Sequence, residues 1–120
     1  MNAIISDQVG SSLLYENDTL RIWKLELEPG QETPMHRHTH SYIWYAVQGG
    51  PLDCEDENGN DLGIFDVPTN SVFDIRYDNG ELVIDSDVMQ GTRFPATHKA
   101  KNVGSKRYVE ILFEQKTSGA

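Results

Sequence analysis

Three of the four histidines in this 120-residue chain lie within five positions, in the segment His36-Arg37-His38-Thr39-His40. In a β-strand, residues two positions apart point to the same side, so His36 and His38 would face one way together. Neutral imidazole binds Fe, Mn, Co, Ni, Cu and Zn, and three protein nitrogens leave coordination positions open for a substrate or oxygen. The pair indicates a metal site, although an isolated H-x-H motif is more often a solvated strand.

Two residues are candidates for the third metal ligand. His98 lies far downstream in the segment Thr97-His98-Lys99, where strand alternation places it on the face opposite Lys99. His40 has the same parity as His36 and His38, so it could complete the set instead. The residues alone leave both alternatives open.

Short runs with strand character are separated by turn residues throughout the chain. Asn58-Gly59 and Asn79-Gly80 lie between such runs and predict tight turns, because both residue types tolerate a positive φ. Alternation slips near Trp23, which predicts a bulge there. No segment has helical periodicity, so we expect one all-β domain over residues 1–120, an antiparallel sandwich or barrel with a core at about 13–115 and a frayed tail over 116–120. The expected strands are 20–28, 42–47, 52–55, 62–67, 71–77, 82–84, 98–103 and 107–115.

Composition excludes several classes of partner. The formal net charge is -9 and no basic run exists, so we expect no nucleic-acid partner. The chain has no apolar stretch long enough to span a bilayer, and its first residues do not resemble a signal peptide. A single cysteine, Cys54, permits no internal disulfide, so we expect a cytoplasmic protein in which Cys54 is a partly buried strand residue.

The segment from Gly30 to Gly49 resembles the first sequence motif of the cupin family, G-x5-H-x-H-x(3,4)-E-x6-G. Gly30, His36, His38 and Gly49 match the spacing, and Tyr42 stands where the family usually has glutamate. The residues that follow Tyr42 are similar to those of small cupins assigned to β-alanine degradation. The resemblance implies a small, single-domain, RmlC-like cupin with a double-stranded β-helix, or jelly roll, closed into a single barrel.

The second cupin motif, G-x5-P-x-G-x2-H-x3-N, is matched only at its end, by Pro95, His98 and Asn102. This resemblance implies that His98 joins His36 and His38 as the third metal ligand. His40 would then lie beside the site or at the pocket mouth as a proton carrier, with a simple exposed histidine as the alternative.

Four further residues are candidates for the surroundings of the metal. Tyr42 could ligate as a phenolate, donate a hydrogen bond next to the metal, or only fill the barrel, and we favour the hydrogen bond. Trp44 could wall the pocket or belong to the core. Arg93 could bind a substrate carboxylate with two hydrogen bonds. His40 and Tyr42 are the candidates for handling protons during catalysis.

The missing glutamate makes the site similar to that of three-histidine cupins, which include thiol and diketone-cleaving dioxygenases. We therefore expect one divalent ion, Fe(II) in preference to Zn, Mn, Ni or Co, and oxygen-dependent chemistry on a small anionic organic molecule. The alternatives are a redox-neutral isomerase or lyase and a module that only binds a small ligand. The strand at 107–115 has apolar residues on both faces, which predicts a homodimer.

Overall fold

The structure is a computed structural model that describes residues 5–116. Its regular elements are all strands, and no helix in the described part of the chain is long and apolar enough to cross a membrane. The strands are β1 (Ser12–Glu16), β2 (Leu20–Leu27), β3 (His36–Arg37), β4 (Tyr42–Gln48), β5 (Gly50–Asp56), β6 (Asp61–Val67), β7 (Val72–Asp78), β8 (Glu81–Ile84), β9 (Arg93–Pro95), β10 (Thr97–Asn102) and β11 (Tyr108–Gln115).

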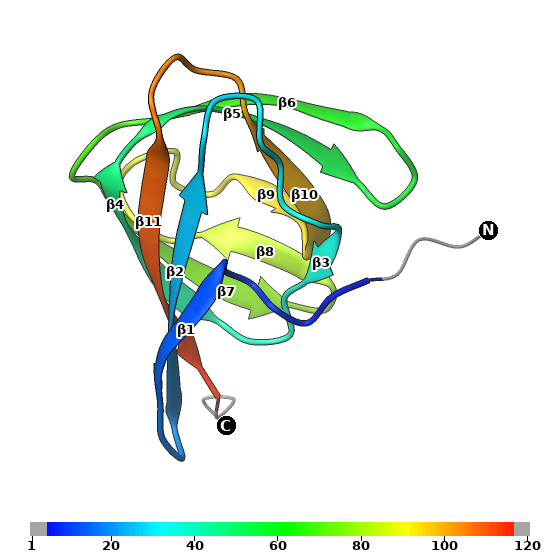
Figure 1. The fold of residues 1–120 in the computed structure, drawn as a ribbon. Coiled ribbons are helices and arrows are strands. Elements are labelled where there is room, and N and C mark those ends of the chain that lie inside the picture. The colour runs from blue at the N-terminus through cyan, green and yellow to red at the C-terminus, as the bar shows by residue number, and fades with distance from the viewer. Residues whose placement is uncertain (1–4, 117–120) are drawn as a thin grey trace.

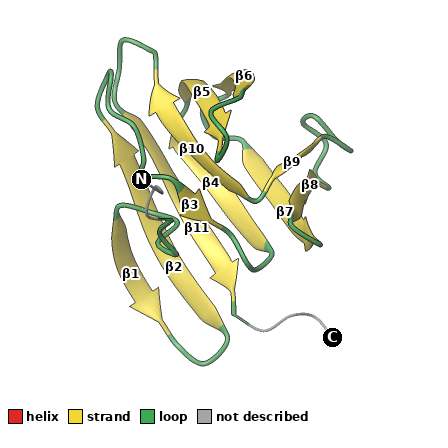
Figure 2. Ribbon diagram, turned by 90° about the vertical axis from the view of Figure 1, so that its right-hand side faces the viewer, coloured by secondary structure: helices red, strands yellow, loops and turns green. Residues whose placement is uncertain are grey.

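The strands form two antiparallel sheets that face each other (Figures 1 and 2). The larger has the order β1-β2-β11-β4-β7-β8-β9, and the smaller has the order β3-β10-β5-β6. This is the expected jelly roll, but the sheets do not close into one continuous barrel. Strands β6 and β9 end their sheets without pairing to each other, and side chains from both line a cavity between the sheets.

Alternation along the strands of the larger sheet builds the core. On β4 the side chains of Tyr42, Trp44 and Ala46 are buried, and on β7 those of Phe73 and Ile75 are buried. The rings of Trp44 and Phe73 stack with their centroids 4.3 Å apart. Because aromatic pairs of this kind bury large areas and fix their orientation, they hold β4 and β7 in register at the cavity wall.

The bulge expected at Trp23 is absent from β2. Trp23, Leu25 and Leu27 are buried at regular alternate positions, and Ile22 is the apolar residue that faces outward. The irregularity lies on the partner strand instead, where the register between β1 and β2 shifts between Leu13 and Tyr15. The prediction was wrong because the apparent slip in alternation comes from Ile22, an apolar residue that faces outward.

The expected Asn-Gly turns are both present. Asn79 and Gly80 have φ values of 50° and 88° between β7 and β8, and Gly59 has a φ of 83° between β5 and β6. Three short strands, β1, β3 and β9, were not predicted, because two or three residues carry no recognisable period and β1 is exposed along its whole length.

The described part of the predicted tail is anchored. The Lys116 backbone N–H donates to the Thr19 carbonyl at 2.9 Å, and the Lys116 ammonium lies 2.8 Å from the Glu16 carboxylate. Residues 117–120 of that predicted tail lie outside the described residues.

Asn102 fastens three backbone segments at one end of the fold. Its side-chain amide donates to the carbonyls of Leu27 and Lys106, both at 2.8 Å, and its oxygen accepts from the Gly104 N–H at 2.9 Å. The side chain is 1% exposed. Asn102 is therefore a structural residue.

We predict that Asn102→Ala lowers the free energy of unfolding by about 2–4 kcal/mol, because it leaves buried carbonyl groups without donors. Urea unfolding measures this, with Asn58→Ala on the exposed β5–β6 turn as the control, which should change stability by less than about 0.5 kcal/mol. An Asn102 variant as stable as the control would contradict the role given to this side chain.

Candidate metal centre

His36 and His98 are direct cross-strand neighbours. Strand β3 pairs with β10 in the register that sets His36 opposite His98, and the two side chains emerge on the same face of the smaller sheet. The chain continues beside β10, where the His38 backbone N–H donates to the Ala96 carbonyl at 2.9 Å. Residues far apart in the sequence are thus brought together by a two-residue ladder and one hydrogen bond.

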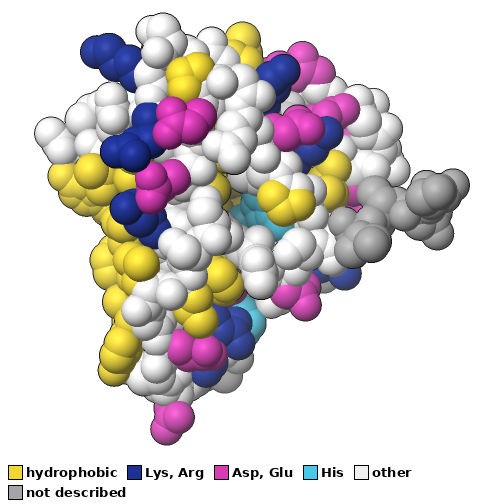
Figure 3. All heavy atoms as spheres, viewed as in Figure 1, with side chains coloured by type: hydrophobic (Ala, Val, Ile, Leu, Met, Phe, Trp, Pro, Cys, Tyr) yellow, Lys and Arg dark blue, Asp and Glu magenta, His cyan; other side chains and the backbone are white. Residues whose placement is uncertain are grey.

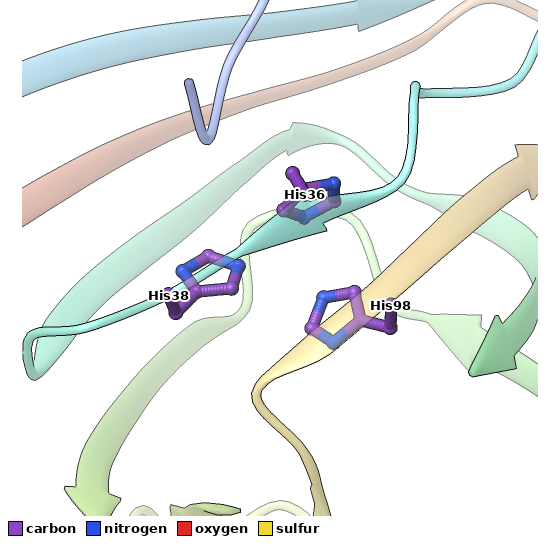
Figure 4. Close-up of side chains that lie close together, drawn as sticks. All are labelled: His36, His38 and His98. Carbon is purple, nitrogen blue, oxygen red and sulfur yellow. The ribbon is translucent and has the colours of Figure 1, made fainter. Parts of the chain in front are cut away.

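The three imidazoles form a buried cluster (Figure 4). Ring centroids are 5.0 Å apart for His36 and His38, 4.7 Å for His36 and His98, and 5.1 Å for His38 and His98. Each residue offers one ring nitrogen, and these three nitrogens lie within 4.8 Å of one another. His40 is not part of this group, which leaves His98 as the third member that the cupin motif implied.

Hydrogen bonds set the orientation of two of the rings. His36 Nδ1 lies 3.0 Å from the Pro34 carbonyl, and His98 Nδ1 lies 2.7 Å from the Pro95 carbonyl. A carbonyl only accepts, so each Nδ1 carries the hydrogen and each Nε2 keeps a lone pair for a metal. His38 Nδ1 is buried and has no hydrogen-bond partner among the described residues.

The cluster is electrostatically suited to a cation. Burial and the neighbouring imidazole of His36 lower the pKa of His98 to about 4. Burial and both neighbouring imidazoles hold the pKa of His38 well below its usual value. Burial also lowers the pKa of His36. The rings are therefore neutral near pH 7, and three neutral imidazoles around a shared space are a fitting donor set for a divalent transition metal.

Tyr42 lies against the cluster, with its ring stacked on that of His38 at a centroid distance of 4.5 Å. Burial raises the pKa of the Tyr42 phenol well above its usual value, and the carboxylate of Glu110 adds to this rise. With its ring stacked on His38 and its phenol protonated, Tyr42 packs directly against the histidine cluster.

The other predicted pocket residues are placed differently from one another. Trp44 is buried and lines the cavity. Arg93 borders the same cavity, but its guanidinium lies 3.1 Å from Asp78 and 3.3 Å from Glu81, so its charge is already paired. His40 is half-buried and does not line the cavity. Its Nδ1 lies 3.6 Å from the Glu114 carboxylate and 3.0 Å from the Thr39 hydroxyl, so the structure does not bring it to the metal centre.

The cavity beside the histidines has a volume of about 290 Å³ and is lined chiefly by apolar side chains. Figure 3 shows histidine in a hollow at the centre of one face, bordered by hydrophobic side chains. A volume at the lower end of the usual range for ligand sites suits a small organic molecule. The apolar lining includes Leu25, Trp44, Leu52, Phe65, Ile75, Phe94 and Leu112.

One polar cavity residue was missed by sequence reasoning about ligands. Glu110 is 6% exposed and its Oε1 accepts a hydrogen bond from the Tyr108 hydroxyl at 2.7 Å. Cys54 also lines the cavity and is the partly buried strand residue that was expected: it lies on β5, and burial raises the pKa of its thiol to about 11, so it is an unreactive thiol. Alternation along β11 could have revealed Glu110, because it has the same parity as the buried residues Tyr108 and Leu112.

Comparison with known proteins supports the fold. No protein-family model matches the sequence, and a search of curated proteins gives no match. Among solved structures, a cupin domain from Bordetella pertussis Tohama I has a TM-score of 0.63 at 19% identity, over 97% of this chain and 95% of that one. The chain has the cupin fold.

Two further structures agree with that assignment. A Klebsiella pneumoniae protein with a double-stranded β-helix domain gives a TM-score of 0.54 at 15% identity, over 92% of this chain and 82% of that one. A cupin-2 domain from Rhodospirillum rubrum gives 0.51 at 13% identity, over 90% of this chain and 60% of that one. At these identities the likeness concerns the fold, and the chemistry must be argued from the site.

We predict that Glu110 makes the protein less stable as pH rises. Burial raises the pKa of Glu110 to about 7 in the folded state, above its usual value of 4.5, so the folded chain holds a proton that the unfolded chain releases. The contribution of Glu110 to the free energy of unfolding is fully present below about pH 4.5 and is lost as pH rises through about 7. Over this range the free energy of unfolding falls by on the order of 3 kcal/mol because of this group.

Chemical unfolding of the wild type and of Glu110→Gln between pH 5 and pH 8 checks this. Comparing the two proteins cancels the opposite contribution of the histidines, whose lowered pKa values cost stability as pH falls. Between pH 5 and pH 8 the free energy of unfolding of the variant should rise by about 2–3 kcal/mol relative to that of the wild type. Parallel curves would show that Glu110 does not titrate there.

Proposed function

We propose that this protein is a metal-dependent oxidoreductase that binds a small anionic organic molecule at Fe(II) held by His36, His38 and His98. The observation that carries the proposal is the set of three buried, neutral imidazoles beside an apolar cavity, with no carboxylate in the group among the described residues. Neutral ligands leave the two positive charges of the ion uncompensated, which favours a substrate that binds as an anion. Bound Fe(II) would supply a centre that activates O2.

The chain's own residues have distinct tasks in this proposal. The three imidazoles bind the ion through neutral nitrogens, and the carbonyls of Pro34 and Pro95 hold two of these rings in orientation. Tyr42, stacked on His38, would keep its proton and donate a hydrogen bond next to the metal. The apolar side chains around the cavity exclude water from the reacting molecule.

The metal site is tested by metal analysis of protein loaded with Fe(II) without oxygen. We predict one ion per chain in the wild type and at least about a hundredfold weaker binding in His98→Ala, because two imidazoles remain from a set of three. His40→Ala is the matched control and should bind the ion as the wild type does. Loss of metal in the His40 variant, with retention in the His98 variant, would overturn the ligand assignment.

The reaction class is tested with an oxygen electrode. Fe(II)-loaded protein is offered small carboxylates, thiols and diketones, and we predict oxygen uptake with at least one class that depends on His98. No uptake with any class would contradict the proposed oxygen-dependent reaction. Equal turnover with Zn(II) or Mn(II) under nitrogen would indicate a redox-neutral isomerase or lyase, and a ligand recovered unchanged would indicate a binding module.

We also propose that the protein acts as a homodimer in a reducing, cytoplasmic environment. The outward side chains of β4 and β11 form an apolar patch that Ile22 of β2 extends, since Phe113 lies opposite both Ile22 and Ile43. Ile111 lies opposite Tyr45 on one side and Lys24, at the border of the patch, on the other. Figure 3 shows hydrophobic side chains gathered along the left flank of the molecule. An apolar sheet face of this kind fits the two-fold contact of a second copy.

Sedimentation measures the assembly. We predict a dimer for the wild type and a monomer for Phe113→Lys, because a charge at the centre of a self-complementary face is buried twice in the contact. Lys106→Ala, on the exposed turn before β11, is the control and should leave the dimer intact. A wild-type protein that stays monomeric at high concentration would overturn the proposal.

A further inference from the structure

We propose that Glu110 determines the specificity of the cavity by binding a primary ammonium group at one end of a small zwitterionic ligand, whose anionic end lies at the histidine cluster. This inference rests on the proposed function for the position of the anionic end. It adds to the same cavity a second binding group, the Glu110 carboxylate, which would bind a cation where the metal would bind an anion.

Glu110 is a buried carboxyl group on the cavity wall without a cationic partner. Among the described residues its recorded hydrogen bond is the one from Tyr108 to Oε1, so Oε2 remains for a ligand. None of the ion pairs of residues 5–116 includes Glu110. The surrounding wall is apolar, formed by side chains such as Leu25 and Leu112.

Glu114 on the same strand shows how this fold otherwise accommodates a buried carboxylate. Its Oε1 accepts from Trp23 Nε1 at 2.9 Å, and Arg21 lies 3.4 Å away from the same oxygen. Glu114 also has His40 at 3.6 Å from its other oxygen, and it does not line the cavity. The two glutamates are equally buried, so what distinguishes Glu110 is the missing cation and its place at the cavity.

A buried carboxyl group without a cation is costly to the fold, and it is retained where a ligand can supply the charge. Burial raises the pKa of Glu110 to about 7, so the group can lose its proton near neutral pH when a cation approaches. A ligand ammonium group would form the ion pair and the hydrogen bond to Oε2 together. These are the two interactions that Glu114 receives from Arg21 and Trp23.

The two recognition points lie at different levels of the cavity. In the register of β4 and β11, Tyr42, which stacks on His38, lies opposite Glu114. Glu110 lies opposite Ala46, four residues further along β4. Four strand residues correspond to about 13 Å of backbone. The distance between the histidine cluster and the Glu110 carboxyl group is shorter than this, because side chains reach inward from both levels. A short chain with a charge at each end and an apolar stem against Trp44 fits this arrangement.

The test uses matched probes on metal-loaded protein. Straight-chain carboxylates of four to seven carbons are compared by calorimetry with a terminal methyl, hydroxyl or ammonium group. In the wild type we expect at least one ω-amino acid to bind at least tenfold more tightly than the methyl-terminated probe of equal length. Glu110→Gln should reduce this preference to less than twofold, and Glu114→Gln, the matched control, should keep it.

A second variant guards against loss of folding in the first. Glu110→Leu replaces the carboxyl group by an apolar side chain in an apolar wall, so the fold should persist, as thermal unfolding will show. This variant should prefer the methyl-terminated probe. A folded Glu110→Leu protein that still prefers the ω-amino acid would overturn the inference.

The outcomes separate this inference from the proposed function. If the carboxylates bind without preference for the ammonium end, the specificity role of Glu110 is wrong while an anion site at the metal stands. If no carboxylate binds, the anionic part of the proposed function fails, and n-alkylammonium probes of four to six carbons decide the inference alone. Binding that His98→Ala retains and Glu110→Gln loses supports it, and no binding, or binding that Glu110→Gln retains, overturns it.

Discussion

The pairing of β3 with β10 is the constraint on which the candidate site depends. It sets His36 opposite His98 and leads the chain past Ala96, where a backbone hydrogen bond fixes the position of His38. The segment that precedes β3 is also hydrogen-bonded to β10. The Thr33 hydroxyl accepts from the Ala100 N–H, and the Thr33 N–H donates to the Ala100 carbonyl. The position of the site thus depends on hydrogen bonds to β10 that extend on both sides of the two-residue strand β3.

The larger sheet gives this site its surroundings. Its inner face carries aromatic and aliphatic side chains that leave a small apolar cavity, and burial there keeps the imidazoles neutral and the Tyr42 phenol protonated. Charged side chains that could compete for the metal or the substrate are engaged elsewhere, Arg93 with Asp78 and Glu81, and Glu114 with Trp23. Glu110 is the exception, which is why it carries the argument for ligand recognition.

Strand alternation and turn residues allowed much of the fold and two of the three histidines of the candidate metal site to be predicted. His36 and His38 follow from the two-residue period, and the longer strands from their alternation. His98 was implied by the resemblance to the second cupin motif, since no local pattern reports a contact across some sixty residues. The role of the two-residue strand β3 could not be foreseen for the same reason.

The errors have equally local causes. Ile22 is apolar yet faces outward, and the apparent slip in alternation that it causes predicted a bulge where β2 is regular. The resemblance implied a single closed barrel, but β6 and β9 are unpaired edges and the cavity is lined from both of them. Glu110 was overlooked because the strand around it was judged by its apolar residues. Parity placed the carboxyl group inside, and only the three-dimensional structure shows that it lacks a cation.

The central claim is that three imidazoles of this chain, and no other protein group, hold the metal ion. X-ray absorption spectroscopy of protein loaded with Fe(II) under anaerobic conditions tests this most directly. We expect a first shell of nitrogen and oxygen at about 2.0–2.2 Å, with outer-shell scattering from three imidazole rings and no sulfur neighbour. Scattering from two imidazoles or fewer, or a sulfur ligand from Cys54, would contradict it.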